Sequence, residues 1–452
     1  MTLAMKRIFQ LAAAGLALGL LVTGCQGIQT AGEKSARQDL AVITRLLQTN
    51  NPALTTNATL PEVVLFAVKN HPQVVETYAA WAASVENITI ARSLPDLKLT
   101  FELDINDAVQ AIMPGFMADF PGPGKLRARA ELASAEGRAK YFQFESAALQ
   151  TAFGVEKNFY PLYFLEQKID VNRRMLALLD SLEILARTQN EVGRATLQDV
   201  LRAQIEQEKL KTETANLEDS RNVLMAQYKA ALGLKASQPN PPVPTDVKYS
   251  YFGINEEQLL ANALKKNPRL KEMESEIQVA EAAIRVARKE KIPDFSAGGR
   301  ADVKANPIIW NPQFSMTLPI WRDKLAAELA AAQAVKLAAE ARLSTEQINL
   351  AVDFATQAYL IREANRQLDL LRERLLPRAR QSLEVARAAY RAGQVDFLNV
   401  IDSERTLLDF QLDEIAAQTQ REVARAQLIL LIANMPPEGA PILKSETAQT
   451  HH

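Results

Sequence analysis

Apolar and polar residues alternate strictly in three short segments of the chain. Between residues 97 and 105, Leu, Phe and Ile occupy every odd position, and polar residues occupy every even position. A period of two predicts a β-strand with one apolar face. Residues 294–304 and 313–320 alternate in the same way, whereas a fourth strand around residues 116–120 is predicted only weakly. We therefore expect up to four amphipathic strands.

Two very long helices are predicted at about residues 125–190 and 322–389. Neither run contains a strand signal, and each contains a single proline. At 1.5 Å per residue, such a helix reaches roughly 100 Å. Each run ends near a glycine and reverses into a second helix, at about 197–234 or 396–434. The last of these helices has an imperfect apolar stripe close to heptad spacing, which indicates pairing between helices.

The same order of elements occurs twice, about 200 residues apart. Pro95-Asp96 corresponds to Pro293-Asp294, and each of these dipeptides precedes an alternating segment. We therefore interpret the chain as one pseudo-twofold protomer rather than as unrelated domains. Its expected parts are a signal peptide (1–24), an extended tether (25–57), a first repeat (58–236), a proline-rich linker (237–253), a second repeat (254–434) and a tail (435–452).

The N-terminal residues have the pattern of a bacterial lipoprotein leader. A basic start is followed by an apolar run of about 15 residues, which suits a signal-peptide core better than a membrane span. The run ends in Leu21-Val22-Thr23-Gly24-Cys25, which matches the lipoprotein box. Cleavage before Cys25 would leave a lipidated N-terminus, and Gln26 fits delivery to the outer membrane. The alternative is a plain signal peptide with an incidental cysteine.

Composition excludes several classes of function. The 52 basic and 53 acidic residues balance, so no nucleic-acid partner is expected. The sequence contains no Walker loop, no Gly-x-Ser-x-Gly elbow and no zinc-type Cys/His cluster. We therefore expect no enzyme activity, no cofactor and no metal site. After residue 25, no apolar run is long enough for a spanning helix.

The strands constrain the assembly. Segments of this length, apolar on one face and polar on the other, match the wall of an outer-membrane barrel. Four strands alone would leave two edges of unpaired backbone groups in lipid. Several chains must therefore share one barrel, and three chains would supply twelve strands. The predicted fold class is mainly α, with long α-hairpins and a small transmembrane β part. The alternative is a small soluble sheet that caps a helical bundle.

Over about residues 58–434 the chain resembles the TolC-like outer-membrane efflux factors. The most specific match is the turn from Tyr390 to Val400, with its counterpart from Asn190 to Leu201. The resemblance implies a homotrimer with a β-barrel in the outer membrane and an α-helical tunnel in the periplasm. It implies a passive conduit whose helical turns meet a periplasmic adaptor protein, while an inner-membrane pump supplies the energy.

Candidate site residues follow from the turns and from the resemblance. Gly193 and Gly393 suit tight reversals, because glycine adopts positive φ without steric cost. The resemblance places a periplasmic gate at Tyr390 and Asp199. It places a constriction that selects ions at Asn399 and Asp402. A solvated polar helix face is the alternative for these polar positions.

The sequence leaves the cargo and two rival functions open. The resemblance would place a basic gate residue at position 395, but this chain has Val395, so an ionic latch is not reproduced. The segment from Phe120 to Lys125 looks like the helix entry of heavy-metal efflux members, but metal ions and organic compounds both remain candidate cargo. The rival functions are a periplasmic adaptor lipoprotein and a structural coiled-coil envelope lipoprotein.

Overall fold

The computed structural model describes residues 29–48, 54–55, 58–105, 109–244 and 256–432. The chain divides into two compact units. The sheet unit comprises residues up to Leu46, Thr77–Phe144 and Arg269–Glu346. The hairpin unit comprises Leu47–Glu76, Glu145–Pro268 and residues from Gln347 onward. Cys25, the signal peptide and the C-terminal tail lie outside the described residues.

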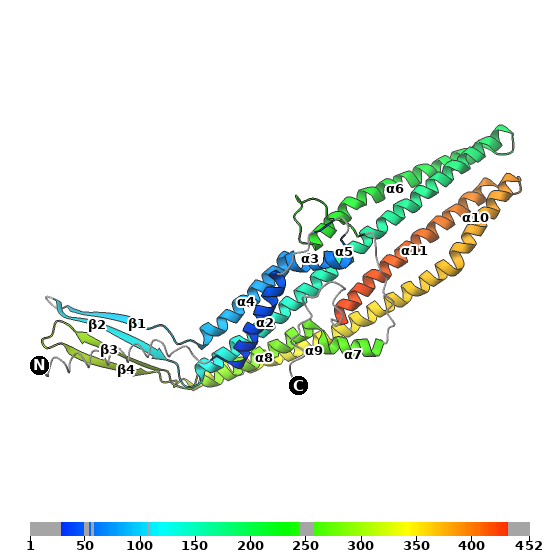
Figure 1. The fold of residues 1–452 in the computed structure, drawn as a ribbon. Helices are drawn as coiled ribbons and strands as arrows, with labels where there is room; N and C mark the ends of the chain where they lie inside the picture. The colour runs from blue at the N-terminus through cyan, green and yellow to red at the C-terminus, as the bar shows by residue number, and fades with distance from the viewer. Residues whose placement is uncertain (1–28, 49–53, 56–57, 106–108, 245–255, 433–452) are drawn as a thin grey trace. The chain divides into compact units, whose positions relative to one another are not determined.

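The elements follow the duplicated order that the sequence predicts (Figure 1). The first half contains α2 (Ala31–Gln48), α3 (Leu60–Asn70), α4 (Pro72–Arg92), β1 (Lys98–Ile105), β2 (Val109–Phe120), α5 (Lys125–Glu191) and α6 (Leu197–Ala231). The second half contains α7 (Glu256–Lys266), α8 (Pro268–Lys289), β3 (Phe295–Asp302), β4 (Ile309–Met316), α9 (Arg322–Leu370), a π-helical turn η1 (Leu371–Leu375), α10 (Leu376–Arg391) and α11 (Phe397–Ile432). None of these helices is both long and apolar enough to cross a membrane.

The four strands form one antiparallel sheet in the order β1-β2-β3-β4. The duplication is reproduced in the pairing itself. Leu99 lies opposite Phe116 in the first strand pair, and Ala297 lies opposite Phe314 in the second. Both partners are displaced by 198 residues, so the two hairpins have the same register. The seam between the halves joins β2 to β3, with Phe116 opposite Gly299.

One face of the sheet is apolar, as the alternation predicts. Its exposed side chains include Leu99, which is 86% exposed, and Phe314, which is 82% exposed. Phe101, Phe116, Phe295 and Met316 also lie on this face and are exposed. On the opposite face, Arg300 forms an ion pair with Glu102 across β2. Because β2 has Gly115 at this point, the two side chains can meet above it.

Two strand predictions were wrong in extent. β2 has twelve residues, whereas the sequence indicated only a weak strand around 116–120. Pro114 and Gly115 lie inside β2 and interrupt the apolar pattern, which concealed it. β4 ends at Met316 rather than continuing to residue 320. After the strand, Thr317 still donates its N–H to the carbonyl oxygen of Asp294 at 2.9 Å, and Pro319 then prevents further ladder bonds.

The prediction of an extended tether over residues 25–57 was also wrong, because Ala31–Gln48 forms α2. Apolar residues at positions 40, 43 and 47 recur at helical spacing, and Ile43 is buried. Glu33 is buried as well and pairs with Arg92 of α4 at 2.8 Å. These contacts hold the segment against the sheet unit as a helix.

The long helices match the prediction with one refinement. α5 runs without interruption for 67 residues, or roughly 100 Å. Its counterpart is divided, because the π-helical turn η1 separates α9 from α10 just before Pro377. Proline lacks an N–H and its ring displaces the preceding carbonyl, so a wider turn accommodates it.

Candidate functional site at the helical turns

The two hairpin turns have nearly identical backbones. Gly193 and Gly393 have φ of 72° and 71°, a conformation that favours glycine. The Gly193 N–H donates to the carbonyl of Asn190 at 2.9 Å, and the Gly393 N–H donates to that of Tyr390 at 3.0 Å. Nothing lies within 4 Å of a Cβ built on either glycine. Backbone conformation, rather than crowding, therefore requires glycine in both turns.

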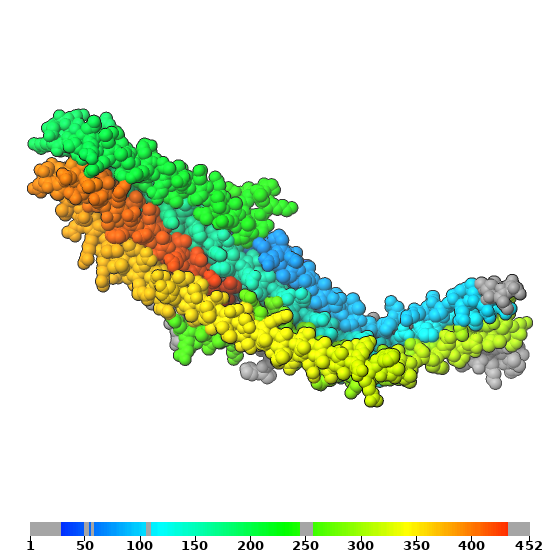
Figure 2. All heavy atoms as spheres, turned by 180° about the vertical axis from the view of Figure 1, so that it is seen from behind, coloured from blue at the N-terminus to red at the C-terminus, as the bar shows by residue number. Residues whose placement is uncertain are grey.

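The two hairpin tips lie side by side within the hairpin unit (Figures 1 and 2), and buried apolar side chains of both hairpins pack together there. Their contact is a continuous apolar cluster, here called the tip cluster, to which α5, α6, α10 and α11 all contribute. Its members are Met175, Leu179, Leu182, Ala186, Val200, Ala203, Leu210, Leu376, Ala379, Leu383, Tyr390, Phe397, Val400, Ile401 and Leu407. Val395 packs against it. The position where the resemblance would place a basic residue thus contributes to apolar packing.

Tyr390 is a buried member of this cluster and only 6% exposed. Its ring centroid lies 5.3 Å from that of Phe397, and its hydroxyl has no hydrogen-bond partner among the described residues. Burial, together with the nearby Asp199 carboxylate, raises the pKa of Tyr390 to about 12. The structure therefore brings the two predicted gate residues near each other without a hydrogen bond between them.

Asp199 has a local role that the sequence analysis missed. Its Oδ2 accepts the backbone N–H of Thr196 at 3.1 Å, three residues earlier and just before α6. This is the reciprocal half of a capping box, which satisfies an N–H that the helix leaves unpaired. The Thr196-x-x-Asp199 spacing was visible in the sequence and could have indicated the cap.

Asn399 and Asp402 lie on α11, and both side chains are exposed. They line a groove between α10 and α11 together with Arg378, Ser382 and Thr406. Thr406 donates its hydroxyl to the backbone carbonyl of Asp402, one turn earlier in the same helix. The two predicted constriction residues therefore share one solvated surface of the second hairpin.

A charged layer below the tip was not predicted from the sequence. Arg405 of α11 donates to both carboxylate oxygens of Glu206 on α6, at 2.6 and 3.0 Å. The neighbouring Glu404 is only 2% exposed, and neither of its carboxylate oxygens has a hydrogen-bond partner among the described residues. Burial raises the pKa of Glu404 to about 8, against the smaller opposing effects of Arg387 and Arg405. A glutamate on the apolar stripe of the last helix was the signal that could have revealed this group.

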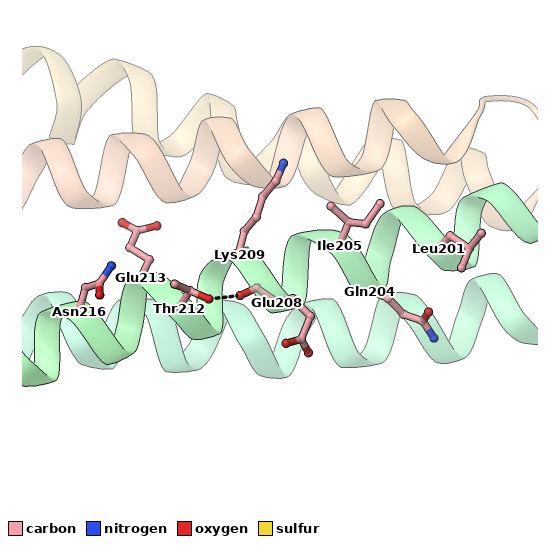
Figure 3. A pocket seen from close by; sticks show the side chains of 8 residues that line it. All are labelled: Leu201, Gln204, Ile205, Glu208, Lys209, Thr212, Glu213 and Asn216. Atoms are coloured by element: carbon pink, nitrogen blue, oxygen red, sulfur yellow. Dashed lines mark hydrogen bonds between the residues drawn. The ribbon is translucent and has the colours of Figure 1, made fainter.

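A shallow groove follows α6 beside the second hairpin (Figure 3). Leu201 and Ile205 line it near the tip, and Glu208, Lys209 and Glu213 line it further along the helix. Thr212 donates its hydroxyl to the backbone carbonyl of Glu208 in the same helix, at 2.9 Å, so it adds little polarity to the groove. In the described ranges, no group of three or more His, Cys, Asp or Glu side chains is arranged to hold a metal ion.

Comparison with known proteins finds a matching family profile and a curated relative. Residues 259–434 match the profile of the outer membrane efflux protein family. A curated relative, the cobalt-zinc-cadmium resistance protein CzcC of Cupriavidus metallidurans, is 24% identical over 233 residues. The match covers 49% of this chain and spans about half of that relative's length, 52%.

Solved structures cover more of the chain. The outer membrane protein VceC of Vibrio cholerae matches with a TM-score of 0.70 at 17% identity, over 83% of this chain and 96% of that one. CusC matches with a TM-score of 0.70 at 16% identity, over 82% and 91% of the two chains. The open state of the Neisseria gonorrhoeae MtrE outer membrane channel matches with a TM-score of 0.69 at 18% identity, over 84% and 90%. The family profile thus matches residues 259–434, and most of the chain shares its fold with VceC and CusC.

Proposed function

We propose that the protein is the outer-membrane channel of a tripartite efflux system. Three copies form a passive conduit that exports substrates from the periplasm, with an iris-like gate at the helical turns. A periplasmic adaptor and an inner-membrane pump are the partners, and the pump supplies the energy. The two repeats, 58–236 and 254–434, each contribute one helical hairpin and one strand pair to this conduit.

The observation that carries this proposal is the exposed apolar face of the sheet. Leu99, Phe101, Phe314 and Met316 all lie on it, and in water such a surface would be costly. In an outer-membrane wall the same face contacts lipid, while the opposite face, with Glu102 and Arg300, lines water. An adaptor or a structural coiled-coil spacer requires no such face, so this observation favours the channel over both.

The tip cluster supports a gate at the turns. Tyr390, Asp199 and Val395 lie where the two hairpins pack together, so separating the hairpins would expose the cluster. Closure then depends mainly on apolar packing, with the Glu206–Arg405 pair below it. Tyr390→Ala tests the gate, because it removes an aromatic ring from the cluster, and we expect a higher single-channel conductance than in the parent protein.

The membrane anchor is a second part of the proposal. Lipidation of Cys25 would tether the protein to the outer membrane in addition to the sheet, because each buried methylene of an acyl chain contributes roughly 0.8 kcal/mol. Mass spectrometry of the mature protein tests this directly. An unmodified Cys25 would contradict the lipid anchor and leave the channel proposal standing.

Divalent metal cations are the cargo that we propose. The support is the similarity to a relative whose name assigns it to cobalt, zinc and cadmium resistance. The rival cargo is organic compounds. A deletion strain should become sensitive to these metals, and the parent gene should restore resistance. Sensitivity restricted to organic compounds would overturn the metal assignment.

The channel itself is tested with purified protein. We expect detergent-stable trimers that insert into planar bilayers and conduct ions. Replacing Phe314, on the apolar face, by Arg should abolish insertion, because a charge at the lipid midplane costs about 2–4 kcal/mol. A monomeric, water-soluble protein without conductance would refute the proposed function.

A further inference from the structure

Glu404 is a buried carboxyl group at the contact between the two helical hairpins. Its side chain is 2% exposed, and neither oxygen has a hydrogen-bond partner among the described residues. Arg387 of its own hairpin and Glu206 of the first hairpin both lie close enough to influence its ionisation. An ionised carboxylate without a partner is costly in such surroundings, so the group takes up a proton instead. Apolar packing of the tip does not by itself require an acid at this position.

The first repeat shows how a carboxylate is accommodated at the same level. Glu183 of α5 accepts hydrogen bonds at 2.7, 2.9 and 3.2 Å from the side chains of Arg187, Gln204 and Gln207. These bonds lower the pKa of Glu183, and the bond from Gln204 has the largest effect. In the first repeat, therefore, the carboxylate stays ionised because three donors surround it.

The second repeat has lost this arrangement. Its turn glycine lies 200 positions after that of the first repeat. With this offset, Leu383 replaces the acceptor Glu183, and Leu407 replaces one amide donor. Both leucines are buried. Glu404 itself stands where the first repeat has Gln204. The acid has thus moved to a position at which apolar side chains replace its former partners.

One charged donor is retained, but it is directed elsewhere. Arg387 corresponds to Arg187 and donates to Glu384 at 3.3 Å. The Glu384 side chain is 73% exposed, so this pair lies in water. Burial is the main cause that raises the pKa of Glu404, and Arg387 has the largest effect in the opposite direction. A guanidinium group is therefore held near the buried acid without pairing with it.

The other charged groups of this layer are already paired. On α6, Glu206 accepts from Arg405 at 2.6 Å and from Lys209 at 3.1 Å. On α5, Glu183 is held by its three donors. On α11, Asp402 is exposed to solvent. Glu404 is therefore the acid of this layer whose burial is uncompensated.

We infer that Glu404 is a proton-responsive switch, which keeps the tip closed in acid and favours its opening as the pH rises. This inference rests on the proposed channel and adds a regulation to its gate. While the hairpins are packed, the Glu404 carboxyl is protonated and neutral. When α11 moves away from α6, water reaches the carboxyl, its O–H bond breaks and the proton passes to water. Opening of the tip is thereby coupled to proton release.

The direction of the pH dependence follows from the two states of Glu404. In the packed state its pKa is raised to about 8, whereas the ordinary value is 4.5. The closed tip therefore binds more protons between these two values. Its stabilisation is fully present below about pH 4.5 and is lost as the pH rises through about 8. In this range the ratio of open to closed tips should rise by up to about tenfold per pH unit for each copy.

Single-channel recordings of the purified full-length protein between about pH 5 and pH 9 test this switch. Ionic strength is held constant, because exposed ion pairs respond to salt. In the parent protein, the open probability should rise with pH. Glu404→Gln should abolish this rise and leave the tip closed at every pH, since the amide stays neutral. Retention of the parent's pH response in Glu404→Gln would overturn the inference.

Asp413→Asn is the matched control. It removes a carboxylate from an exposed position on the same helix, and it should keep the parent's pH response. If this control also lost the response, general surface charge rather than the buried acid would control opening.

Two further variants keep Glu404 and change its partners. Leu407→Gln restores the amide that the first repeat has at this level, one turn after Glu404 on α11. Glu384→Gln releases Arg387 from its exposed partner. Both changes should give the ionised carboxylate a partner and lower the pH of half-maximal opening by about one unit or more. An unchanged midpoint in both variants would overturn the inference, even if Glu404→Gln failed to fold.

The same recordings separate this switch from the proposed function. A channel whose open probability is equal at all pH values would refute the switch and leave the channel standing. A protein that never conducts would refute the channel, and the switch with it.

Discussion

Arg405 and Glu206, 199 positions apart in sequence, form a two-point ion pair between the two helical hairpins. Nη2 of Arg405 lies 2.6 Å from Oε1 of Glu206, and Nε lies 3.0 Å from Oε2. Planar guanidinium–carboxylate pairs of this kind fix geometry as well as charge. The pair therefore holds α11 against α6 at a level just below the tip cluster.

Loss of this pair should loosen the tip. Arg405→Gln removes the charge that holds Glu206, and we expect a higher open probability in planar bilayers. The closed state should lose about 1 kcal/mol or less relative to the open state. The control is Arg173→Gln, which removes the 2.7 Å pair to Glu218 inside the first hairpin alone. Equal effects of the two variants on gating would contradict a role of the Arg405 pair between hairpins.

The buried Glu404 predicts a pH dependence of stability. The pKa of Glu404 in the fold, about 8, lies above the ordinary value of 4.5, so folding favours the protonated form. This contribution is fully present below about pH 4.5 and is lost as the pH rises through about 8. The charged groups that influence Glu404 are Arg387, Glu206 and Arg405.

Glu404→Gln mimics the protonated carboxyl and should remove this part of the pH dependence. Melting temperatures of the detergent-solubilised protein between about pH 5 and pH 9 measure the effect. Glu191→Gln, at an exposed position near the end of α5, is the matched control. The assignment fails if the parent protein and Glu404→Gln lose the same stability between these pH values.

The turn glycines should not tolerate a side chain. Gly393→Ala places a Cβ on a residue with φ of 71°, which costs roughly 1–2 kcal/mol. Gly154→Ala is the control, because Gly154 lies inside α5 with nothing within 4 Å of an added Cβ. That variant should be stabilised by roughly 0.5–1 kcal/mol, since alanine favours helix. Thermal unfolding that ranks the two variants in the opposite order would contradict the turn assignment.

The two faces of β4 should respond differently to charge. Phe314→Arg puts a cation on the apolar face, whereas Gln313→Arg puts one on the polar face of the same strand. We expect only Phe314→Arg to impair assembly in the outer membrane. An arginine facing lipid at the bilayer midplane destabilises a barrel by about 2–4 kcal/mol. Fractionation of cell envelopes measures this difference. Similar yields of both variants in the outer membrane would argue against a lipid-facing sheet.

Asp402 should influence ion selectivity. Its carboxylate lines the groove between α10 and α11, and three copies around an axis would form an acidic ring. Asp402→Ala should reduce cation preference and block by multivalent cations in planar bilayers. Asn399→Ala, one turn earlier in the same groove, changes no charge and serves as the control. Unchanged reversal potentials in Asp402→Ala would place the selective constriction elsewhere.

Sequence pattern alone predicted the strands, the long helices and their duplication, because these features depend on local periodicity. A period of two identified β1 and β3, and glycines at 193 and 393 identified both reversals. The pattern failed where local chemistry was ambiguous. Pro114 and Gly115 concealed the length of β2, and the polar composition of Ala31–Gln48 concealed a helix whose buried face is narrow.

Tertiary structure decided which distant residues meet. Arg405 meets Glu206, and Asp199 approaches Tyr390, although the partners lie about 200 positions apart in different hairpins. Glu404 is buried where these hairpins pack together. No local period encodes such a pairing, since it depends on how α6 packs against α11 and how β2 registers with β3. The sequence by itself determined the elements and their twofold order. The packing of the two halves against each other determined which charged side chains pair and which groups are buried at the site.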